Sequence, residues 1–237
     1  MTTMLHESVK SIQQWLFPGN CLLCAARVLT DTDFCADCDA ALPRLTATCP
    51  RCAAPMVEGG MSVQPCGQCQ QRTPAFARTL AMFQYAPPID RLLQGLKYHR
   101  RLELARLLGR RLAAFVEGHA VANVDRIVPV PLHSTRLRER GYNQSLEIAR
   151  PLARRLEIPL DYESVRRERA TEPQTGLPHK ARQRNVRGAF SASDALAGLR
   201  VALVDDVMTT GHTVNTLARC VRQAGAKAVE IWVVARA

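Results

Sequence analysis

Apolar positions recur along the second part of the chain at the spacings of strands and helices. Apolar or β-branched runs predict strands over 79–85, 126–132, 201–204 and 229–235. Helical spacing predicts helices over 88–98, 102–116, 143–156 and about 209–224. Pro151 lies inside the third of these helices and should kink it, because proline cannot donate a backbone hydrogen bond. The stretch 171–186 is polar without an apolar period, so we expect a mobile loop there.

The same pattern divides the chain into parts. Residues 201–204 form an apolar run of the kind that is buried on both faces of a parallel sheet. Residues before 74 contain few large apolar side chains. We therefore expect an N-terminal segment (1–17), a small module (18–73) and an α/β domain (74–237). A chain of 237 residues with 47% hydrophobic content is long enough for one such domain plus an appended module.

Eight of the nine cysteines form four CxxC pairs, all within the small module. The pairs are Cys21 and Cys24, Cys35 and Cys38, Cys49 and Cys52, and Cys66 and Cys69. A CxxC turn directs two thiolates toward one ion, and two such turns complete a tetrahedral four-cysteine site suited to zinc. A redox dithiol or an iron–sulfur cluster is the alternative, but four repeats without the context of a thioredoxin motif favour zinc.

Two complete four-cysteine sets leave no open coordination position, so the two expected zinc ions are structural. Pairing of successive CxxC turns would give one site from the first four cysteines and one from the last four. Interleaved pairing of the turns is the alternative that spacing leaves open.

The basic charge of the chain lies outside the cysteine module. The formal net charge of +11 consists of −1 over residues 1–73 and +12 over residues 74–237, and half of the latter falls on residues 136–187. Charge this concentrated predicts a polyanionic partner, either a nucleic acid or a small phosphorylated ligand. Zinc held by thiolates would make the module more negative. We therefore expect the module to brace the domain or dock a protein rather than to be the main contact for nucleic acid.

A phosphate site is expected directly after the apolar run 201–204. Asp205 and Asp206 come at the carboxyl end of that strand, where open α/β sheets bind ligands. The small residues that follow open a helix, whose first backbone N–H groups can hold a phosphate. They are Thr209, Thr210, Gly211 and Thr213. The two carboxylates can accept ribose hydroxyls and help to hold Mg²⁺, whereas the alternative is an ordinary turn beside a surface acidic pair.

Residues 201–213 resemble the motif with which type I phosphoribosyltransferases bind phosphoribosyl diphosphate (PRPP). A second segment, Val128-Pro-Val-Pro-Leu-His-Ser-Thr-Arg-Leu-Arg-Glu-Arg-Gly-Tyr-Asn-Gln144, is similar to the VPVPLH and RGYNQ stretches of the ComF family. The four CxxC pairs resemble a double zinc ribbon, which nucleobase-salvage enzymes lack. The chain thus resembles ComF proteins from about residue 18 to its end.

The resemblance implies roles for two further groups of residues. Segment 128–144 takes the place of the loop that receives the diphosphate, with His133, Arg136, Arg138 and Arg140 as candidate contacts. A solvated face is the alternative for any one of these arginines. The polar stretch corresponds to the flexible loop that closes over the reacting centre of type I enzymes. Its matching residues are Thr171, Gln174, Arg182 and Asn185.

The resemblance also implies a fold and a function. The fold is that of type I phosphoribosyltransferases, a parallel sheet flanked by helices, with the zinc module in front and a small hood from residues before about 100. The ligands would be PRPP and Mg²⁺. The role would be in natural transformation, with single-stranded DNA and DNA-processing proteins as partners. Because only 5% of residues are aromatic, we expect modest and salt-dependent DNA binding.

Two aspects of function stay open at this point. No residue identifies an acceptor, so an active phosphoribosyltransferase in nucleotide or nucleoside metabolism is the alternative function, and the fold alone does not establish catalysis. The chain shows neither the apolar core of a signal peptide nor an apolar run long enough to cross a membrane. We therefore expect a cytoplasmic protein.

Overall fold

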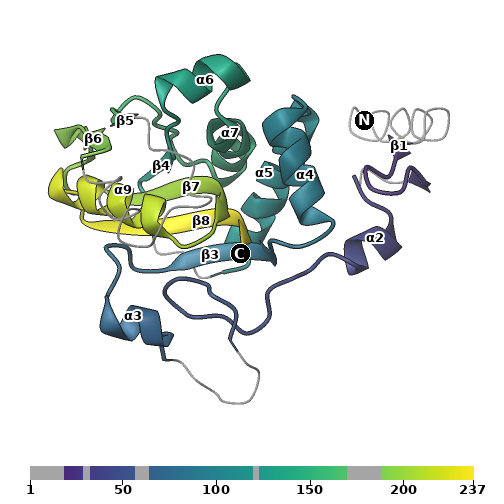
Figure 1. The fold of residues 1–237 in the computed structure, drawn as a ribbon, viewed down its shortest axis with the longest axis horizontal. Coiled ribbons are helices and arrows are strands. Elements are labelled where there is room, and N and C mark those ends of the chain that lie inside the picture. Colours follow the sequence, from purple (N-terminus) through teal and green to yellow (C-terminus); the bar gives the residue numbers. More distant parts are fainter. Residues whose placement is uncertain (1–18, 29–32, 57–63, 120–122, 170–187) are drawn as a thin grey trace, which may run out of the picture. The chain divides into compact units, whose positions relative to one another are not determined.

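The computed structural model describes residues 19–28, 33–56, 64–119, 123–169 and 188–237, and its central feature is a parallel sheet (Figure 1). The strands are β3 (Thr79–Gln84), β4 (Arg126–Pro129), β7 (Arg200–Met208) and β8 (Ala228–Arg236), in the spatial order β3-β8-β7-β4. Ala81 lies opposite Val233, Val204 opposite Trp232, and Ile127 opposite Ala202. The parallel sheet predicted from the run 201–204 is confirmed.

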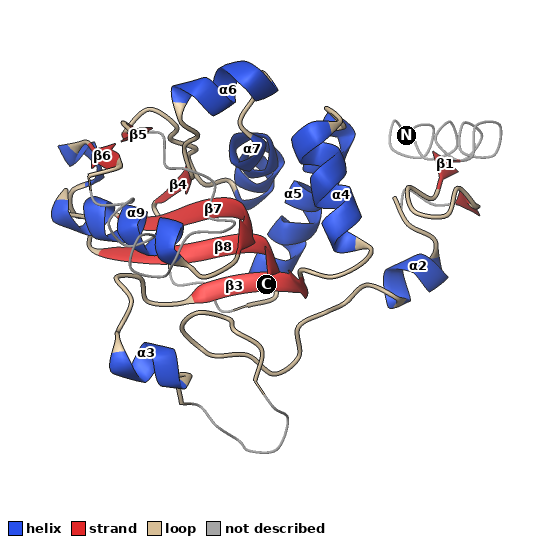
Figure 2. Ribbon diagram, in the orientation of Figure 1, coloured by secondary structure: helices blue, strands red, loops and turns tan. Residues whose placement is uncertain are grey.

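Helices cover both faces of this sheet (Figure 2). They are α4 (Ile89–Tyr98), α5 (Leu102–Glu117), α7 (Gln144–Leu156) and α9 (His212–Gln223), whereas the short helix α6 (Ser134–Arg140) has no buried residue. The four helices predicted in the second part of the chain correspond to α4, α5, α7 and α9. A small antiparallel ribbon of β5 (Val165–Arg167) and β6 (Phe190–Ala192) and the 3-10 turn η1 (Asp194–Leu196) complete these elements.

Helices α5 and α7 pack closely because a glycine lies at their contact. A Cβ atom on Gly109 would lie 2.3 Å from the carbonyl oxygen of Ile148 and 2.5 Å from Cγ of Pro151. Pro151 lies inside α7, where the sequence placed it, and is buried there, whereas the kink expected at this residue stays a prediction. Any larger side chain at position 109 would separate the two helices, so Gly109 fixes the helix that carries part of the site described below.

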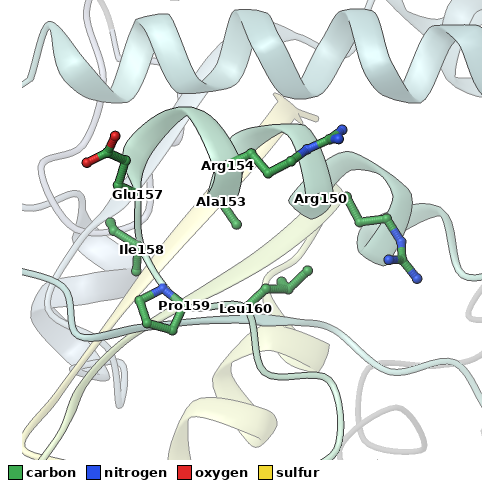
Figure 3. A pocket seen from close by; sticks show the side chains of 7 residues that line it. All are labelled: Arg150, Ala153, Arg154, Glu157, Ile158, Pro159 and Leu160. Carbon is green, nitrogen blue, oxygen red and sulfur yellow. The ribbon is translucent and has the colours of Figure 1, made fainter.

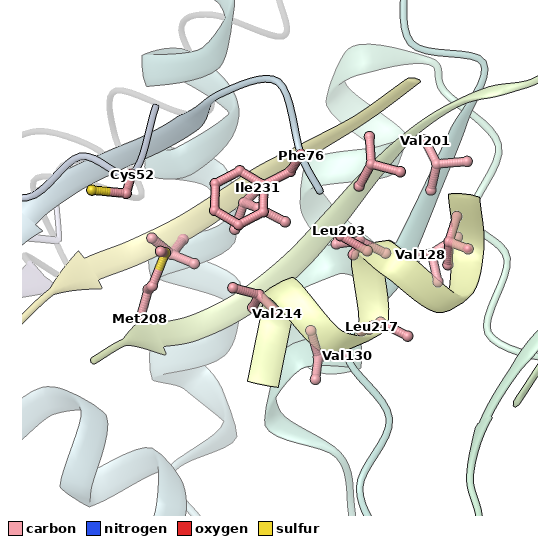
Figure 4. Packing of buried hydrophobic residues seen from close by; sticks show 14 of the residues in the cluster. Cys52, Phe76, Val128, Val130, Val201, Leu203, Met208, Val214, Leu217 and Ile231 are labelled. Carbon is pink, nitrogen blue, oxygen red and sulfur yellow. The ribbon is translucent and has the colours of Figure 1, made fainter. Parts of the chain in front are cut away.

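The opposite face of the sheet shares its core with the second group of cysteines. Val201 and Leu203 of β7 belong to a cluster of buried residues together with Val214 of α9, and Cys52 and Phe76 belong to the same cluster (Figure 4). Burial of these apolar side chains supplies the main driving force for this arrangement. The segment that carries the last four cysteines is therefore part of the same core as the sheet.

The chain forms two compact units, Met1–Pro43 and Arg44–Ala237. The first contains β1 (Gly19–Asn20), β2 (Arg27–Val28) and α2 (Ala36–Ala40), and the second adds α3 (Gly67–Gln71) to the elements given above. The division falls between the second and the third CxxC pair. The change of composition at residues 73–74 lies inside the second unit.

Irregular segments pair with both outer strands of the sheet. Arg44 forms an isolated bridge with Phe83 of β3, and the N–H of Leu45 donates to the carbonyl of Met82 at 3.3 Å. At the other side, the N–H of Ile127 in β4 donates to the carbonyl of Pro159 at 2.9 Å. The carbonyl of Ile127 accepts from the N–H of Asp161 at 2.8 Å.

Two elements differ from the sequence prediction. Strand β7 continues to Met208, paired with Arg236 of β8, so Asp205 and Asp206 lie within the strand rather than after it. Helix α6 forms where a loop was expected, because the side chain of His133 caps its start and Gly141, at φ 85°, ends it.

The small hood expected from residues before about 100 stays a prediction, and β3 in that range belongs to the main sheet. Across the described ranges, no helix combines the length and the apolar character that crossing a membrane requires.

Candidate functional site

The eight paired cysteines gather into two clusters. The sulfur atoms of Cys21, Cys24, Cys35 and Cys38 lie within 4.8 Å of one another, and so do those of Cys49, Cys52, Cys66 and Cys69. Successive CxxC turns are thus brought together. A tetrahedral zinc ion with Zn–S bonds of about 2.3 Å requires sulfur atoms about 3.8 Å apart. The Sγ atoms of Cys24 and Cys35, and those of Cys52 and Cys66, are 3.6 Å apart, so both clusters fit zinc.

Within the second cluster, the surroundings shift the pKa values of individual cysteines in opposite directions. Burial acts to raise the pKa of Cys49, but hydrogen bonds from the backbone of Cys52 and Cys66 outweigh it and lower the pKa to about 7. The Cys66 N–H donates to the Cys49 sulfur at 3.2 Å. In contrast, burial and the neighbouring Cys52 raise the pKa of Cys69. Four thiolates this close repel one another, so a cation is needed before all of them ionise.

Protein purified without added metal should contain about two zinc ions per chain, one for each set of four cysteines. Replacing Cys35 by Ser should remove one ion from the first cluster, and replacing Cys66 by Ser should remove one from the second. Elemental analysis of the purified variants measures both effects. Full zinc content in either variant would contradict the assignment of that cysteine as a ligand.

A turn suited to phosphate lies between β7 and α9. It begins at Met208, and α9 starts at His212 after Gly211, whose φ of 75° is the left-handed conformation that glycine adopts without strain. A Cβ atom on Gly211 would lie 2.6 Å from Cε of Met208, the end of a flexible side chain, so it is the backbone conformation that requires glycine. Thr209 and Thr210 are exposed on this turn. Their hydroxyl groups and the N–H groups at the start of α9 can donate to an anion.

Asp205 precedes this turn, and one oxygen of its carboxylate accepts two hydrogen bonds. Its Oδ1 accepts from the hydroxyl of Ser145 at 2.8 Å and from the backbone N–H of Asp206 at 2.9 Å. Burial, and next to it the charge of Asp206, raise the pKa of Asp205 to about 7. Asp205 as a whole residue is partly exposed, whereas Asp206 is buried.

Asp206, in contrast, is buried and bound by other side chains. Its Oδ2 forms an ion pair with Nζ of Lys97 from α4, and its Oδ1 accepts from Nε2 of Gln144 at 3.2 Å. Gln144 in turn accepts a hydrogen bond from Nη1 of Arg140 through its Oε1. Burial acts to lower the pKa of Lys97, but the carboxylate of Asp206 outweighs it and raises that pKa. Asp206 is therefore the centre of a polar network rather than a free ligand group.

The sequence interpretation missed three residues of this network. Lys97 lies in the last turn of the amphipathic helix α4, and Gln144 and Ser145 are the first residues of α7. Gln144 ends the segment that resembles ComF proteins, which was the available signal. Neither the apolar period of the helices nor the spacing of residues along the chain connects Lys97 to Asp205 and Asp206.

The residues of the expected diphosphate loop lie in α6 or cap its start, and their side chains have different surroundings. Arg140 joins the network through Gln144, and Arg136 lies near Arg167, whose pKa is lowered by burial and by the charge of Arg136. His133 caps the helix, accepting from the Thr135 N–H at 3.3 Å, and Arg138 is exposed. The expected flexible-loop residues Thr171, Gln174, Arg182 and Asn185 lie outside the described residues.

A pocket of about 530 Å³ lies elsewhere, at the end of α7 remote from Ser145 (Figure 3). It is lined by Arg150, Ala153 and Arg154 of α7 and by residues 157–160 after it. None of the site residues predicted from the sequence contributes to its lining.

Comparison with known proteins agrees with both parts of this description. Residues 143–237 match the phosphoribosyl transferase domain family, and residues 12–70 match the double zinc ribbon domain family. The chain is 38% identical to the DNA utilization protein YhgH of Escherichia coli K12, over 92% of this chain and 97% of that protein. It is 35% identical to Competence protein F of Haemophilus influenzae, over 73% of this chain and 79% of that protein.

Among solved structures, glutamine PRPP amidotransferase from B. subtilis is 26% identical and superposes with a TM-score of 0.38. That match covers 54% of this chain and 25% of the amidotransferase.

The parallel sheet, its flanking helices and the two cysteine clusters define a protein with a type I phosphoribosyltransferase-like fold preceded by a double zinc ribbon. More narrowly, the chain belongs to the ComF/YhgH family, whose members include proteins named for competence and for DNA utilization.

Proposed function

We propose that this protein binds PRPP together with Mg²⁺ at the carboxyl end of β7 and that it acts in the handling of DNA taken up into the cytoplasm. The observation that carries the ligand assignment is the pairing of Asp205, a partly exposed residue, with the glycine-containing turn 208–213. At the end of one strand, a carboxylate lies next to a helix start that can bind phosphate. These two groups match the hydroxyls and the phosphate of a ribose phosphate. The names of the relatives support the DNA role.

In this proposal each group has a distinct task. Asp205 accepts hydrogen bonds from the ribose hydroxyls. The N–H groups and hydroxyls of residues 209–213 donate hydrogen bonds to the 5-phosphate. Arg136 and Arg140, in and near the network, face the charge of the diphosphate. Bound Mg²⁺ would neutralise part of that charge, and Asp205 is the carboxyl group that fits it. Asp206 keeps Lys97 and Gln144 in place beneath the site.

Calorimetric titration with PRPP in the presence and absence of Mg²⁺ tests the ligand assignment. An assay for released diphosphate across candidate acceptors then separates a phosphoribosyltransferase from a protein that only binds PRPP. Absence of Mg²⁺-dependent binding would contradict the proposal.

A second candidate function is direct binding of single-stranded DNA, and an exposed aromatic side chain favours it. The Tyr98 ring, 70% exposed at the end of α4, directly follows Lys97. Cζ of Arg140 lies 5.7 Å from the centre of this ring. Nη2 of Arg100 comes within 3.8 Å of a Cβ position on Gly141, next to Arg140. A base can stack on such an exposed ring while neighbouring cations neutralise its phosphates.

Replacing Tyr98 by Ala should weaken single-stranded DNA binding about tenfold, because stacking of one base contributes about 1–3 kcal/mol. Fluorescence anisotropy at fixed low salt measures the change. Tyr162→Ala is the matched control, since Tyr162 is also exposed (53%) but lies between Asp161 and Glu163. Partial competition by PRPP and Mg²⁺ is expected because Arg140 adjoins both sites. Equal effects of the two substitutions would contradict a stacking site at Tyr98.

A further inference from the structure

Arg236, near the end of β8, is a buried cation whose partners are backbone carbonyl groups. Only 7% of the residue is exposed. Its Nε donates to the carbonyl of Cys52 at 3.0 Å, and its Nη1 donates to that of Met208 at 3.1 Å. The same Nη1 donates to the carbonyls of Thr209 and Ala237. The planar guanidinium thus holds three segments that are remote in sequence.

These contacts join the second cysteine cluster to the phosphate turn. Cys52 belongs to the second cysteine cluster, and its carbonyl is part of the CxxC turn that shapes it. Met208 and Thr209 begin the turn that we assign to phosphate. A shift of the CxxC turn would leave a donor of Arg236 unpaired in a buried place, which is unfavourable. The guanidinium therefore fixes the position of the phosphate turn relative to the CxxC turn that contains Cys52.

A second contact fixes the far end of the phosphate turn to the same region. The backbone N–H of Ala75, six residues after Cys69, donates to Oδ1 of Asn215 in the first turn of α9 at 2.8 Å. Apolar packing supports both contacts, since Cys52, Phe76, Met208 and Val214 are members of one buried cluster (Figure 4). The phosphate turn is thus held at both ends by the segment that carries the second cluster.

We propose that zinc in the second cluster orders the phosphate turn 208–213, with Arg236 as the positioning residue that couples them. Coupling between two sites is reciprocal, so a ligand on the turn should also slow the loss of this zinc. The first cluster lies in the other compact unit and is not part of this coupling. The ordering of the turn stands on these contacts alone, and only the ligand effect rests on the proposed function.

Hydrogen exchange of the ligand-free full chain tests the ordering. Removing zinc from the second cluster, by Cys66→Ser, should speed amide exchange over residues 209–215 about tenfold, within the range usual for coupled sites. The matched variant Cys24→Ser, which affects the first cluster, should change these amides by less than about twofold. Amides of residues 201–204 in β7 report general loosening. Equal acceleration there and in the turn would overturn the proposal, as would an unchanged turn.

Release of zinc to a chelator tests the role of Arg236 and the reciprocity. In the Cys24→Ser background, PRPP with Mg²⁺ should slow release of zinc from the second cluster about tenfold. Adding Arg236→Lys, which keeps the charge but not the planar set of donors, should remove this protection and raise exchange of the turn in zinc-bound protein. Protection that persists in Arg236→Lys would overturn the assignment of Arg236. If calorimetry detects no PRPP binding while zinc still orders the turn, the proposed ligand is wrong and the coupling stands.

Discussion

Replacing Asp205 by Asn should weaken Mg²⁺-dependent binding of PRPP by about 100-fold or more while the fold is kept. The amide removes the negative charge that we propose binds the ribose hydroxyls and Mg²⁺. Two hydrogen bonds to a charged group, at about 1.5–3 kcal/mol each, account for that factor. The change should not destabilise the protein, because burial and the charge of Asp206 already disfavour the ionised form of Asp205 and raise its pKa to about 7. Isothermal titration calorimetry and thermal unfolding measure the two effects.

The pH dependence of binding follows from the same carboxyl group. With a pKa of about 7 in the free protein, Asp205 is mostly protonated below that pH and accepts hydroxyls poorly. Affinity for PRPP in the unmodified protein should therefore rise as pH increases through about 7 and then level off. Asp205→Asn should lack this component, which separates it from titration of the ligand phosphates.

Asp206→Asn is the matched comparison, since it makes the same chemical change one residue further along β7. Asp206 already binds Lys97 and Gln144, so its loss should reduce PRPP affinity by less than about tenfold but should reduce stability. A loss of affinity as large as that of Asp205→Asn would contradict the different tasks assigned to the two carboxylates.

Replacing Lys97 by Met should lower the free energy of unfolding by about 3–5 kcal/mol, the cost usual for removing one partner of a buried ion pair. The side chains of Lys97 and Asp206 are only 20% and 5% exposed, so water cannot replace the lost partner. Chemical denaturation at pH 7 measures the change.

The double variant Lys97→Met with Asp206→Asn provides the control for that prediction. It removes both charges and keeps an amide for Gln144 to bind, so it should recover a large part of the stability that either single change loses. If the two single losses simply add in the double variant, the ion pair does not stabilise the fold as described.

Contiguous features were the ones that the sequence could predict. The strand, the acidic pair, the phosphate turn and the start of α9 lie within one short stretch, and each CxxC turn is local. The local conformation of these segments is therefore readable from neighbouring residues in the sequence. The resemblance to ComF proteins extended the prediction to residues 128–144.

The partners of these features come from remote parts of the chain. Gln144 and Asp206 are 62 residues apart, and Arg236 and Cys52 are 184 apart. No local pattern connects such residues, because their contact depends on how the sheet and its helices pack. Helix α6 was missed for another reason: it has seven residues and only Leu137 as a large apolar side chain, so it has no apolar period to detect.

The segments that pair with the outer strands bear on how the protein avoids aggregation. An open sheet edge can accept a strand from another molecule, and uncharged six-residue strands are especially prone to this. β3, with the sequence Thr-Leu-Ala-Met-Phe-Gln, is such a strand, and Arg44 and Leu45 cover its outer side. Leu45 lies four residues before Cys49, the first member of the second cysteine cluster, which anchors that part of the chain. Loss of zinc from this cluster would thus expose the edge of β3 for pairing with a strand of another molecule. Removal of zinc would then cause self-association even where the rest of the sheet stays folded.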